Sequence, residues 1–242
     1  MKKEPLTVFI LSAGLGTRLG TLTSNKPKAL VKVGSLPMID RLLINLSQRG
    51  FGHFVINLHH HADLLENHLK QNFPDFDIKF SNERNELLDT GGAIIHAKNL
   101  LLSNDFLIHN VDIIMPCKLF EMLEIHRNNK AMFTLAVSDR NSSRKLLFTK
   151  DGFLCGWKNL TTGELKKNIN FTDNHIALSY SGVQWVSSDY FSIEERKGKF
   201  SIIDAWLEIS NKHPVVAFEH SSNGWYDMGT EQLICKVETE LF

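Results

Sequence analysis

Apolar and polar positions follow two repeating patterns over roughly the first 138 residues. Short runs of β-branched and apolar residues predict strands at 7–12, 53–58, 77–81, 106–111 and 132–138. Apolar residues spaced three or four apart predict helices at 37–49, 63–72, 92–101 and 119–128. Because strands and helices alternate, we expect a mostly parallel sheet with helices on both faces, joined by right-handed crossovers.

The pattern changes in the second half of the chain. Two apolar runs, 146–149 and 153–157, flank Lys150-Asp151-Gly152, which is a hairpin signal. Residues 158–175 are polar and predicted to be irregular, and the remaining predicted elements are strands at 180–186 and 215–219 and helices at 202–211 and 230–240. We therefore expect a single three-layer α/β/α domain of Rossmann-like type over residues 1–242, with a small antiparallel excursion in its second half.

Composition excludes several classes of protein. Lys plus Arg and Asp plus Glu both number 27, so the formal charge is zero, which argues against a protein that coats nucleic acid. No apolar run approaches the ~18–20 residues that span a bilayer, and the apolar part of the N-terminal segment is too short for a signal peptide. We therefore expect a cytoplasmic protein that binds neither nucleic acid nor membrane. Three widely spaced cysteines, Cys117, Cys155 and Cys235, predict reduced thiols rather than disulfides or a zinc site.

A glycine-rich loop follows the first predicted strand, with the sequence Gly14-Leu15-Gly16-Thr17-Arg18. A Gly-x-Gly turn allows backbone N–H groups to approach a phosphate closely. It is neither a dinucleotide-binding fingerprint, because Leu19 stands where the third glycine would be, nor a P-loop, because Gly-Lys-Ser/Thr is absent. Arg18 can contact a phosphate with two hydrogen bonds, and Lys28 adds a second positive charge. These residues together predict a site for a phosphate-bearing ligand.

The segment LSAGLGTRLGTLTSNKPKALVKVGSLPMI resembles the signature of the sugar-1-phosphate nucleotidyltransferases, with Thr21 where that family usually has proline. Further segments continue in the family's order: NLHHHADLLENHL, LLDTGGAI, HNVD, YSG and WYDMGT. The Asp-Thr-Gly-Gly segment is most similar to the short N-acetylmuramate-1-phosphate uridylyltransferase type. The resemblance implies an NTP and a sugar 1-phosphate as substrates, Mg²⁺ as cofactor, a nucleotide-binding half at 1–138 and a sugar-binding half at 139–242. It leaves the sugar and the oligomeric state open.

The resemblance also assigns roles to individual residues. It implies that the catalytic residues are Arg18, Lys28 and Asp112, and that the metal ligands are Asp112 and Asp227. The nucleotide would be bound by Ala13, Gly14, Gly16, Thr17, Arg18, Glu86, Gly91 and Gly92, and the sugar by Asn110, Tyr180, Gly182 and Trp225.

Physical arguments beyond the resemblance support two of these assignments, the metal ligands and the residue that contacts the base. Asp112 ends a predicted central strand, and ligands bind at the carboxyl ends of strands in open α/β sheets. Two carboxylates that share a cation with nucleotide phosphates form a usual magnesium site, and Asp227 supplies the second. Glu86 stands where the family reads the base, and a carboxylate only accepts hydrogen bonds. Glu86 therefore favours UTP as the nucleotide and leaves GTP as an alternative.

Some alternatives remain at this level. The larger relatives hold the sugar phosphate with the lysine of a Glu-Lys-Pro motif, which this chain lacks; Lys158 and Lys166 lie in the corresponding region. A phosphocholine-type cytidylyltransferase would use the same loop with another acceptor. A nucleotide-sugar sensor would bind without turnover, but it would not need to keep two metal-binding aspartates.

Overall fold

The computed structural model describes residues 6–101 and 104–241. Its strands are β1 (Thr7–Leu11), β2 (Lys32–Val33), β3 (Leu36–Pro37), β4 (His53–Leu58), β5 (Asp77–Asn82), β6 (Phe106–Asn110), β7 (Ile113–Ile114), β8 (Phe133–Ser138), β9 (Arg144–Phe148), β10 (Leu154–Asn159), β11 (Leu165–Lys167), β12 (Ile176–Val186), β13 (Val215–Glu219) and β14 (Tyr226–Asp227). Its α-helices are α1 (Met38–Gln48), α2 (Ala62–Asn72), α3 (Asp89–His96), α4 (Lys98–Leu101), α5 (Leu119–Asn128), α6 (Tyr190–Ile193), α7 (Ile202–Ile209) and α8 (Glu231–Leu241). Two 3₁₀ helices, η1 (Thr17–Thr23) and η2 (Lys28–Leu30), follow the glycine loop.

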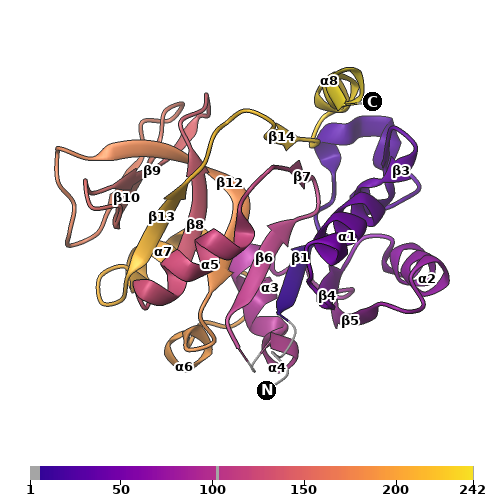
Figure 1. The fold of residues 1–242 in the computed structure, drawn as a ribbon, viewed down its shortest axis with the longest axis horizontal. Coiled ribbons are helices and arrows are strands. Elements are labelled where there is room, and N and C mark those ends of the chain that lie inside the picture. Colours follow the sequence, from indigo (N-terminus) through magenta and orange to yellow (C-terminus); the bar gives the residue numbers. More distant parts are fainter. Residues whose placement is uncertain (1–5, 102–103, 242) are drawn as a thin grey trace.

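The central sheet is mostly parallel, as the alternating pattern predicts (Figure 1). Strands β5, β4, β1 and β6 are neighbours in that order and all pair in parallel. On the other side of β6, β12 runs antiparallel to both β6 and β8, and β13 then pairs with β8 in parallel. The carboxyl ends of β1, β4, β5 and β6 therefore meet at one edge of the sheet.

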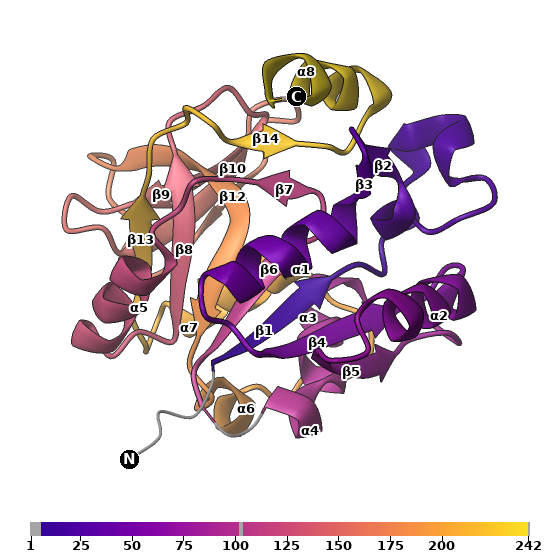
Figure 2. The same cartoon turned by 45° about the vertical axis from the view of Figure 1, so that its right-hand side comes forward.

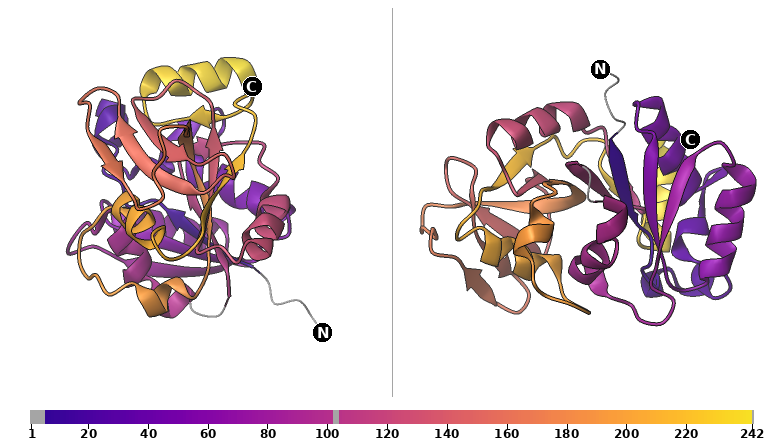
Figure 3. Two further views of the ribbon diagram at one scale, coloured as in Figure 1. Left: turned by 90° about the vertical axis from the view of Figure 1, so that its left-hand side faces the viewer. Right: turned by 90° about the horizontal axis from the view of Figure 1, so that it is seen from below.

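Helices cover both faces of this sheet, which confirms the three-layer expectation (Figure 3). On β1, Val8 and Ile10 join a buried cluster with residues of α1, α2, α5 and α8, whereas Phe9 joins a second cluster with residues of α3, α6 and α7. Successive residues of one strand thus point into different cores, as the pleat requires. Among the described residues, no helix combines the length and apolar character needed to cross a membrane.

The antiparallel part is larger than the sequence predicts. Strands β9, β10 and β11 extend the sheet through the first part of β12, and β11 lies inside the segment 158–175 that was expected to be irregular. Its three residues alternate between exposed and half-buried, so they carry no apolar pattern. The predicted helix 92–101 is also two helices, α3 and α4. Short or edge elements of this kind have too few buried positions to show a period.

The last part of the chain returns to the N-terminal half. Strand β14 pairs antiparallel with β7, which lies directly after β6. Helix α8 then lies beside the β2–β3 hairpin (Figure 2), where Glu238 Oε1 accepts a hydrogen bond from Gly34 N at 2.8 Å. The residues around β14 are therefore placed next to the carboxyl edge of the central sheet.

Candidate functional site

A buried hydrogen-bond network fixes the start of the glycine loop. Asn57 on β4 accepts hydrogen bonds through Oδ1 from Ser12 N (2.7 Å) and Ala13 N (3.1 Å). Its Nδ2 donates to Glu83 Oε1 at 2.9 Å, just after β5. Burial raises the pKa of Glu83, although the hydrogen bond from Asn57 opposes the shift. Because Asn57 occupies these two N–H groups, the loop can offer a phosphate its N–H groups from Gly14 onward.

The two glycines of the loop have different surroundings. A Cβ added at Gly14 would meet no atom within 4 Å, so the side of Gly14 is open. Gly16 has a φ of 66°, and a Cβ there would lie 2.9 Å from Thr23 Cγ2 and 3.1 Å from Lys28 Cβ. Gly16 is therefore required by the turn and its packing, whereas Gly14 leaves room for a ligand.

Two predicted catalytic residues are in direct contact. Lys28, at the start of η2, forms an ion pair with Asp112, which follows β6. Only 12% of the Lys28 side chain and 13% of the Asp112 side chain are exposed. The shielding of this pair from water strengthens its electrostatic interaction with any charged ligand nearby.

The return of the chain brings Asp227 and Arg18 to the same place. Met228 N donates a hydrogen bond of 2.8 Å to the carbonyl oxygen of Asp112, so Asp227 on β14 is placed beside Asp112, which directly precedes β7. Asp227 Oδ1 accepts from Gly229 N at 2.7 Å. A Cβ at Gly229 would lie 2.6 Å from Arg18 Nη2 and 2.7 Å from Asp227 Oδ1, so the guanidinium packs over this glycine beside the carboxylate.

The donor set at this place suits a hard cation. Asp112 and Asp227 can supply two carboxylate oxygens, the ligand type that Mg²⁺ prefers. Within residues 6–101 and 104–241, no group of three or more His, Cys, Asp or Glu side chains is arranged to hold a metal. A cation held by these two carboxylates would take its remaining ligands from water or from a phosphate-bearing ligand.

A cavity of about 380 Å³ opens beside these residues. Five of the predicted site residues line it: Ala13, Gly14, Lys28, Asn110 and Asp112. It is also lined by residues that the sequence reasoning did not select, among them Asn57, Glu83, Asp89, Thr90 and Lys199. Asn57 and Glu83 could have been found, because each stands at the carboxyl end of a predicted strand of the parallel sheet, the edge at which ligands bind.

Three predicted nucleotide-binding residues lie elsewhere. A Cβ at Gly91 would lie 2.3 Å from the Phe200 ring, and one at Gly92 would lie 2.1 Å from the carbonyl oxygen of Gly198. Both glycines thus admit the chain's own segment 198–200, and Gly91 N donates to Phe200 O at 3.0 Å. Glu86 is exposed and does not line the cavity. The motif spacing thus identified two positions that require glycine, Gly91 and Gly92. A nucleotide-binding role for these two residues and for Glu86 stays a prediction.

The predicted sugar-binding residues are brought together around a bulge in β12. Gly182 has a φ of 84°, and a Cβ there would lie 3.2 Å from Asn110 Nδ2. Trp225 Nε1 donates to the carbonyl oxygen of Ser181 at 3.0 Å. The Tyr180 ring, in contrast, packs edge-on against Trp206 with centroids 4.9 Å apart, and burial raises the pKa of its hydroxyl. The backbone of Tyr180 therefore belongs to this cluster, whereas its ring packs against the hydrophobic core.

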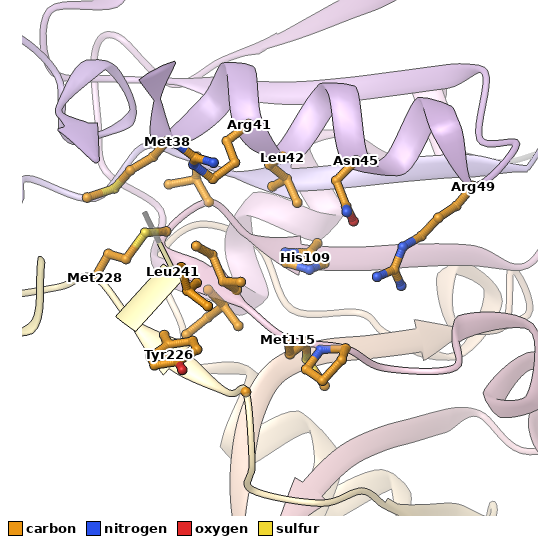
Figure 4. Close-up of a pocket in the computed structure, with 15 residues that line it drawn as sticks. Met38, Arg41, Leu42, Asn45, Arg49, His109, Met115, Tyr226, Met228 and Leu241 are labelled. Atoms are coloured by element: carbon orange, nitrogen blue, oxygen red, sulfur yellow. The ribbon is translucent and has the colours of Figure 1, made fainter. Parts of the chain in front are cut away.

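A second cavity, of about 470 Å³, lies on the other side of Val111 between α1 and the β7–β14 pair. Arg41 and Asn45 of α1 and Arg49, which follows that helix, line it on one side, with Tyr226 and Met228 on the β14 side (Figure 4). Burial lowers the pKa of His109 there to about 4, so its imidazole is neutral at pH 7. None of the predicted site residues line this cavity.

Comparison with known proteins is consistent with this geometry. A family model described as "Nucleotidyl transferase" matches residues 7–146. The N-acetylmuramate alpha-1-phosphate uridylyltransferase of Caulobacter vibrioides is 39% identical over 115 residues, 46% of this chain and 48% of that protein. The D-glycero-alpha-D-manno-heptose 1-phosphate guanylyltransferase of Aneurinibacillus thermoaerophilus is 25% identical over 205 residues, 84% of each chain. The matched part thus spans about half the length of the Caulobacter protein.

Solved structures show the same fold. The crystal structure of HddC from Yersinia pseudotuberculosis superposes with a TM-score of 0.79 and covers 98% of this chain and 100% of that one. The two sequences are 22% identical. At this identity the likeness concerns the arrangement of helices and strands.

The contrast between the glycines gives a first testable prediction. Gly92→Ala should destabilise the fold by about 1–3 kcal/mol, because its new methyl group meets backbone. Gly14→Ala should leave the free energy of unfolding within about 0.5 kcal/mol of the original, because its new methyl group meets open space. Urea denaturation of both variants without ligand measures these values. Equal destabilisation by the two substitutions would contradict the assignment of Gly14 to the ligand side.

Proposed function

The chain belongs to the nucleotidyl transferase family, and on that premise we propose that it transfers a nucleotidyl group from an NTP to a sugar 1-phosphate, releasing pyrophosphate. The observation that carries the proposal is the convergence of Arg18, Lys28, Asp112 and Asp227 beside the open side of the glycine loop. These four charged residues come from separate parts of the chain. Lys28 and Asp112 line the cavity beside Gly14, and Arg18 and Asp227 are joined to Asp112 through Met228 and Gly229.

The proposed reaction needs positioning more than proton transfer. A phosphate oxygen of the sugar phosphate attacks the α-phosphorus of the NTP, and pyrophosphate leaves. This nucleophile is already an anion at neutral pH, since the second pKa of a phosphate monoester is about 6. No general base is required. The main barrier is the approach of two polyanions, which preorganised positive charge and N–H donors reduce.

Each residue has a proposed role in this scheme. The N–H groups of Gly14 and Gly16 and the guanidinium of Arg18 would bind the β- and γ-phosphates. Lys28 would leave its ion pair with Asp112 to bind the α-phosphate. Asp112 and Asp227 would hold Mg²⁺, which supplies positive charge to the nucleotide phosphates.

The identity of the substrates is a finer part of the proposal. We favour UTP, with GTP as the alternative, and N-acetylmuramate 1-phosphate as an acceptor. Similarity to the uridylyltransferase of Caulobacter supports UTP together with N-acetylmuramate 1-phosphate. Similarity to the guanylyltransferase of Aneurinibacillus, which extends over more of the chain, supports GTP. Glu83 lines the cavity, whereas Glu86 lies outside it. Both Glu83 oxygens already accept hydrogen bonds, from Asn57 Nδ2 and Leu88 N, so Glu83 would accept an N–H of uracil or guanine in addition to these.

A pyrophosphate-release assay tests the proposed reaction. The four NTPs are each combined with N-acetylmuramate 1-phosphate, mannose 1-phosphate and glucose 1-phosphate in the presence of Mg²⁺. We expect release with UTP or GTP that depends on both the acceptor and Mg²⁺, with an NDP-sugar as the second product. Nucleotide binding without release in every combination would instead favour a sensor.

Kinetics of two variants separate Lys28 from Arg18. Lys28→Ala should lower kcat by roughly 10²–10³, because a donor is lost where charge changes in the transition state. Arg18→Ala should raise the KM for the NTP as well as slow turnover, because the β- and γ-phosphates are present in the bound substrate too. Lys32→Ala, which removes an exposed lysine of β2, serves as the control and should change neither value.

The outcome for Lys28 has a clear alternative. If Lys28→Ala changes only the KM for the sugar phosphate, Lys28 belongs to the acceptor site. Thermal melting of each variant excludes loss of fold as the cause.

A further inference from the structure

Arg140, which follows β8, is held next to the predicted sugar-binding residues. Its Nη2 donates a hydrogen bond of 2.7 Å to the carbonyl oxygen of Tyr180. Its guanidinium lies over the ring of Trp225, with Cζ 3.8 Å from the ring centroid. Trp225 is itself fixed by its hydrogen bond to Ser181. The orientation of the guanidinium is therefore set before any ligand binds.

One donor of this guanidinium is buried without a partner among the described residues. A guanidinium has five N–H donors. In the described part of the chain, the Arg140 guanidinium donates one hydrogen bond, from Nη2 to the carbonyl oxygen of Tyr180. The Nε of Arg140 is buried without a partner there. Buried donors without partners are costly. A ligand with several acceptor oxygens would satisfy them.

The charge of Asp227 acts on the Arg140 guanidinium. Burial lowers the pKa of Arg140, and the nearby carboxylate of Asp227 opposes that shift. The group remains charged at neutral pH, because an arginine guanidinium stays protonated in proteins. This positive charge thus contacts the ring of Trp225, which stands two residues before the proposed metal ligand Asp227 in the chain.

Lys158 and Lys166, the two lysines that the sequence places in the acceptor region, have other surroundings. Lys166 Nζ donates to Asp204 Oδ1 of α7 at 2.8 Å and lies 5.6 Å from the Trp157 ring centroid. Lys158 is exposed on β10. Within residues 6–101 and 104–241, neither lysine forms a hydrogen bond, ion pair or ring contact with Trp225 or β12, so both are less well placed than Arg140 to bind a ligand at that cluster.

We propose that Arg140 binds the phosphate of the acceptor, a dianionic sugar phosphomonoester. This inference rests on the proposed function. The planar fork of a guanidinium matches two phosphate oxygens. The acceptor phosphate must also lie near Asp227, because one of its oxygens attacks the α-phosphorus beside the metal ligands. Arg140 meets both requirements, and it is a binding residue for the acceptor and not for the NTP.

Three variants test this role. Arg140→Met removes the charge and keeps an unbranched side chain that can cover Trp225. Arg140→Lys keeps the charge and removes the planar fork. Arg144→Met is the matched control, because it removes an exposed arginine at the start of β9 and changes the net charge by the same amount.

Steady-state kinetics then give the expected pattern. Arg140→Met should raise the KM for the sugar 1-phosphate by about 10–100-fold, the effect of losing hydrogen bonds to a charged group. The KM for the NTP should stay within about twofold of the original, since Arg140 is assigned to the acceptor alone. Arg140→Lys should recover part of the loss, and Arg144→Met should match the unmodified protein. Equal rises in both KM values together with a lower melting temperature would overturn the proposal, because they indicate a structural role.

A binding measurement separates this inference from the proposed function. N-acetylmuramate 1-phosphate and inorganic phosphate are titrated into the protein and the Arg140→Met variant by calorimetry, without an NTP. If no acceptor supports turnover, the proposed function fails, and the titration still tests Arg140. Phosphate binding that is lost in Arg140→Met and kept in Arg144→Met supports the assignment. Equal binding by all variants, or no binding by the unmodified protein, contradicts it.

Discussion

The hydrogen-bonded return of the chain at β7 and β14 is the interaction on which the candidate site depends. Met228 N donates to the carbonyl oxygen of Asp112, and Asp227 is paired with Ile113. This short ladder joins the last segment of the chain to the end of a central strand. Without it, Asp227 would not lie beside Asp112, and Arg18 would lose the glycine surface over which it packs. The same return brings Trp225 next to the β12 bulge.

A second constraint is the charge balance at the edge of the sheet. Lys28 and Asp112 are largely shielded from water and neutralise each other. Such a pair is costly to separate unless another charged group replaces each partner. A phosphate for Lys28 and a cation for Asp112 would do so together. In the proposed function, the ion pair would therefore favour binding of a nucleotide together with its metal over binding of either alone.

The long-range pattern of the fold follows from the sequence, and the short elements do not. Alternating strands and helices predicted the parallel sheet and its two covered faces, because each of these elements has enough buried positions to show its period. Strands β7 and β14 have two residues each and carry no such signal, although they position both aspartates. The partner of a two-residue strand is decided by the packing of the whole chain.

The same limit applies to the site. Motif spacing found Lys28 and Asp112, which the structure brings into contact. It could not tell that the chain's own segment 198–200 fills the space beside Gly91 and Gly92, since a glycine requirement has the same sequence signal whether a ligand or the backbone approaches. No sequence pattern marked Arg140 as a candidate site residue, because it stands in a polar loop. Its proposed role rests on its contact with Trp225, which only the folded structure shows.

Binding of Mn²⁺, followed by electron paramagnetic resonance, tests most directly the claim that Asp112 and Asp227 form one nucleotide-dependent cation site. Mn²⁺ replaces Mg²⁺ at oxygen ligands, and a non-hydrolysable UTP analogue prevents turnover. We expect one bound ion in the presence of the analogue, and an affinity at least about tenfold lower in both Asp112→Asn and Asp227→Asn. Asp151→Asn, which changes an exposed turn residue, should bind as the unmodified protein does. Undiminished Mn²⁺ binding by a folded Asp227→Asn variant would contradict the shared site.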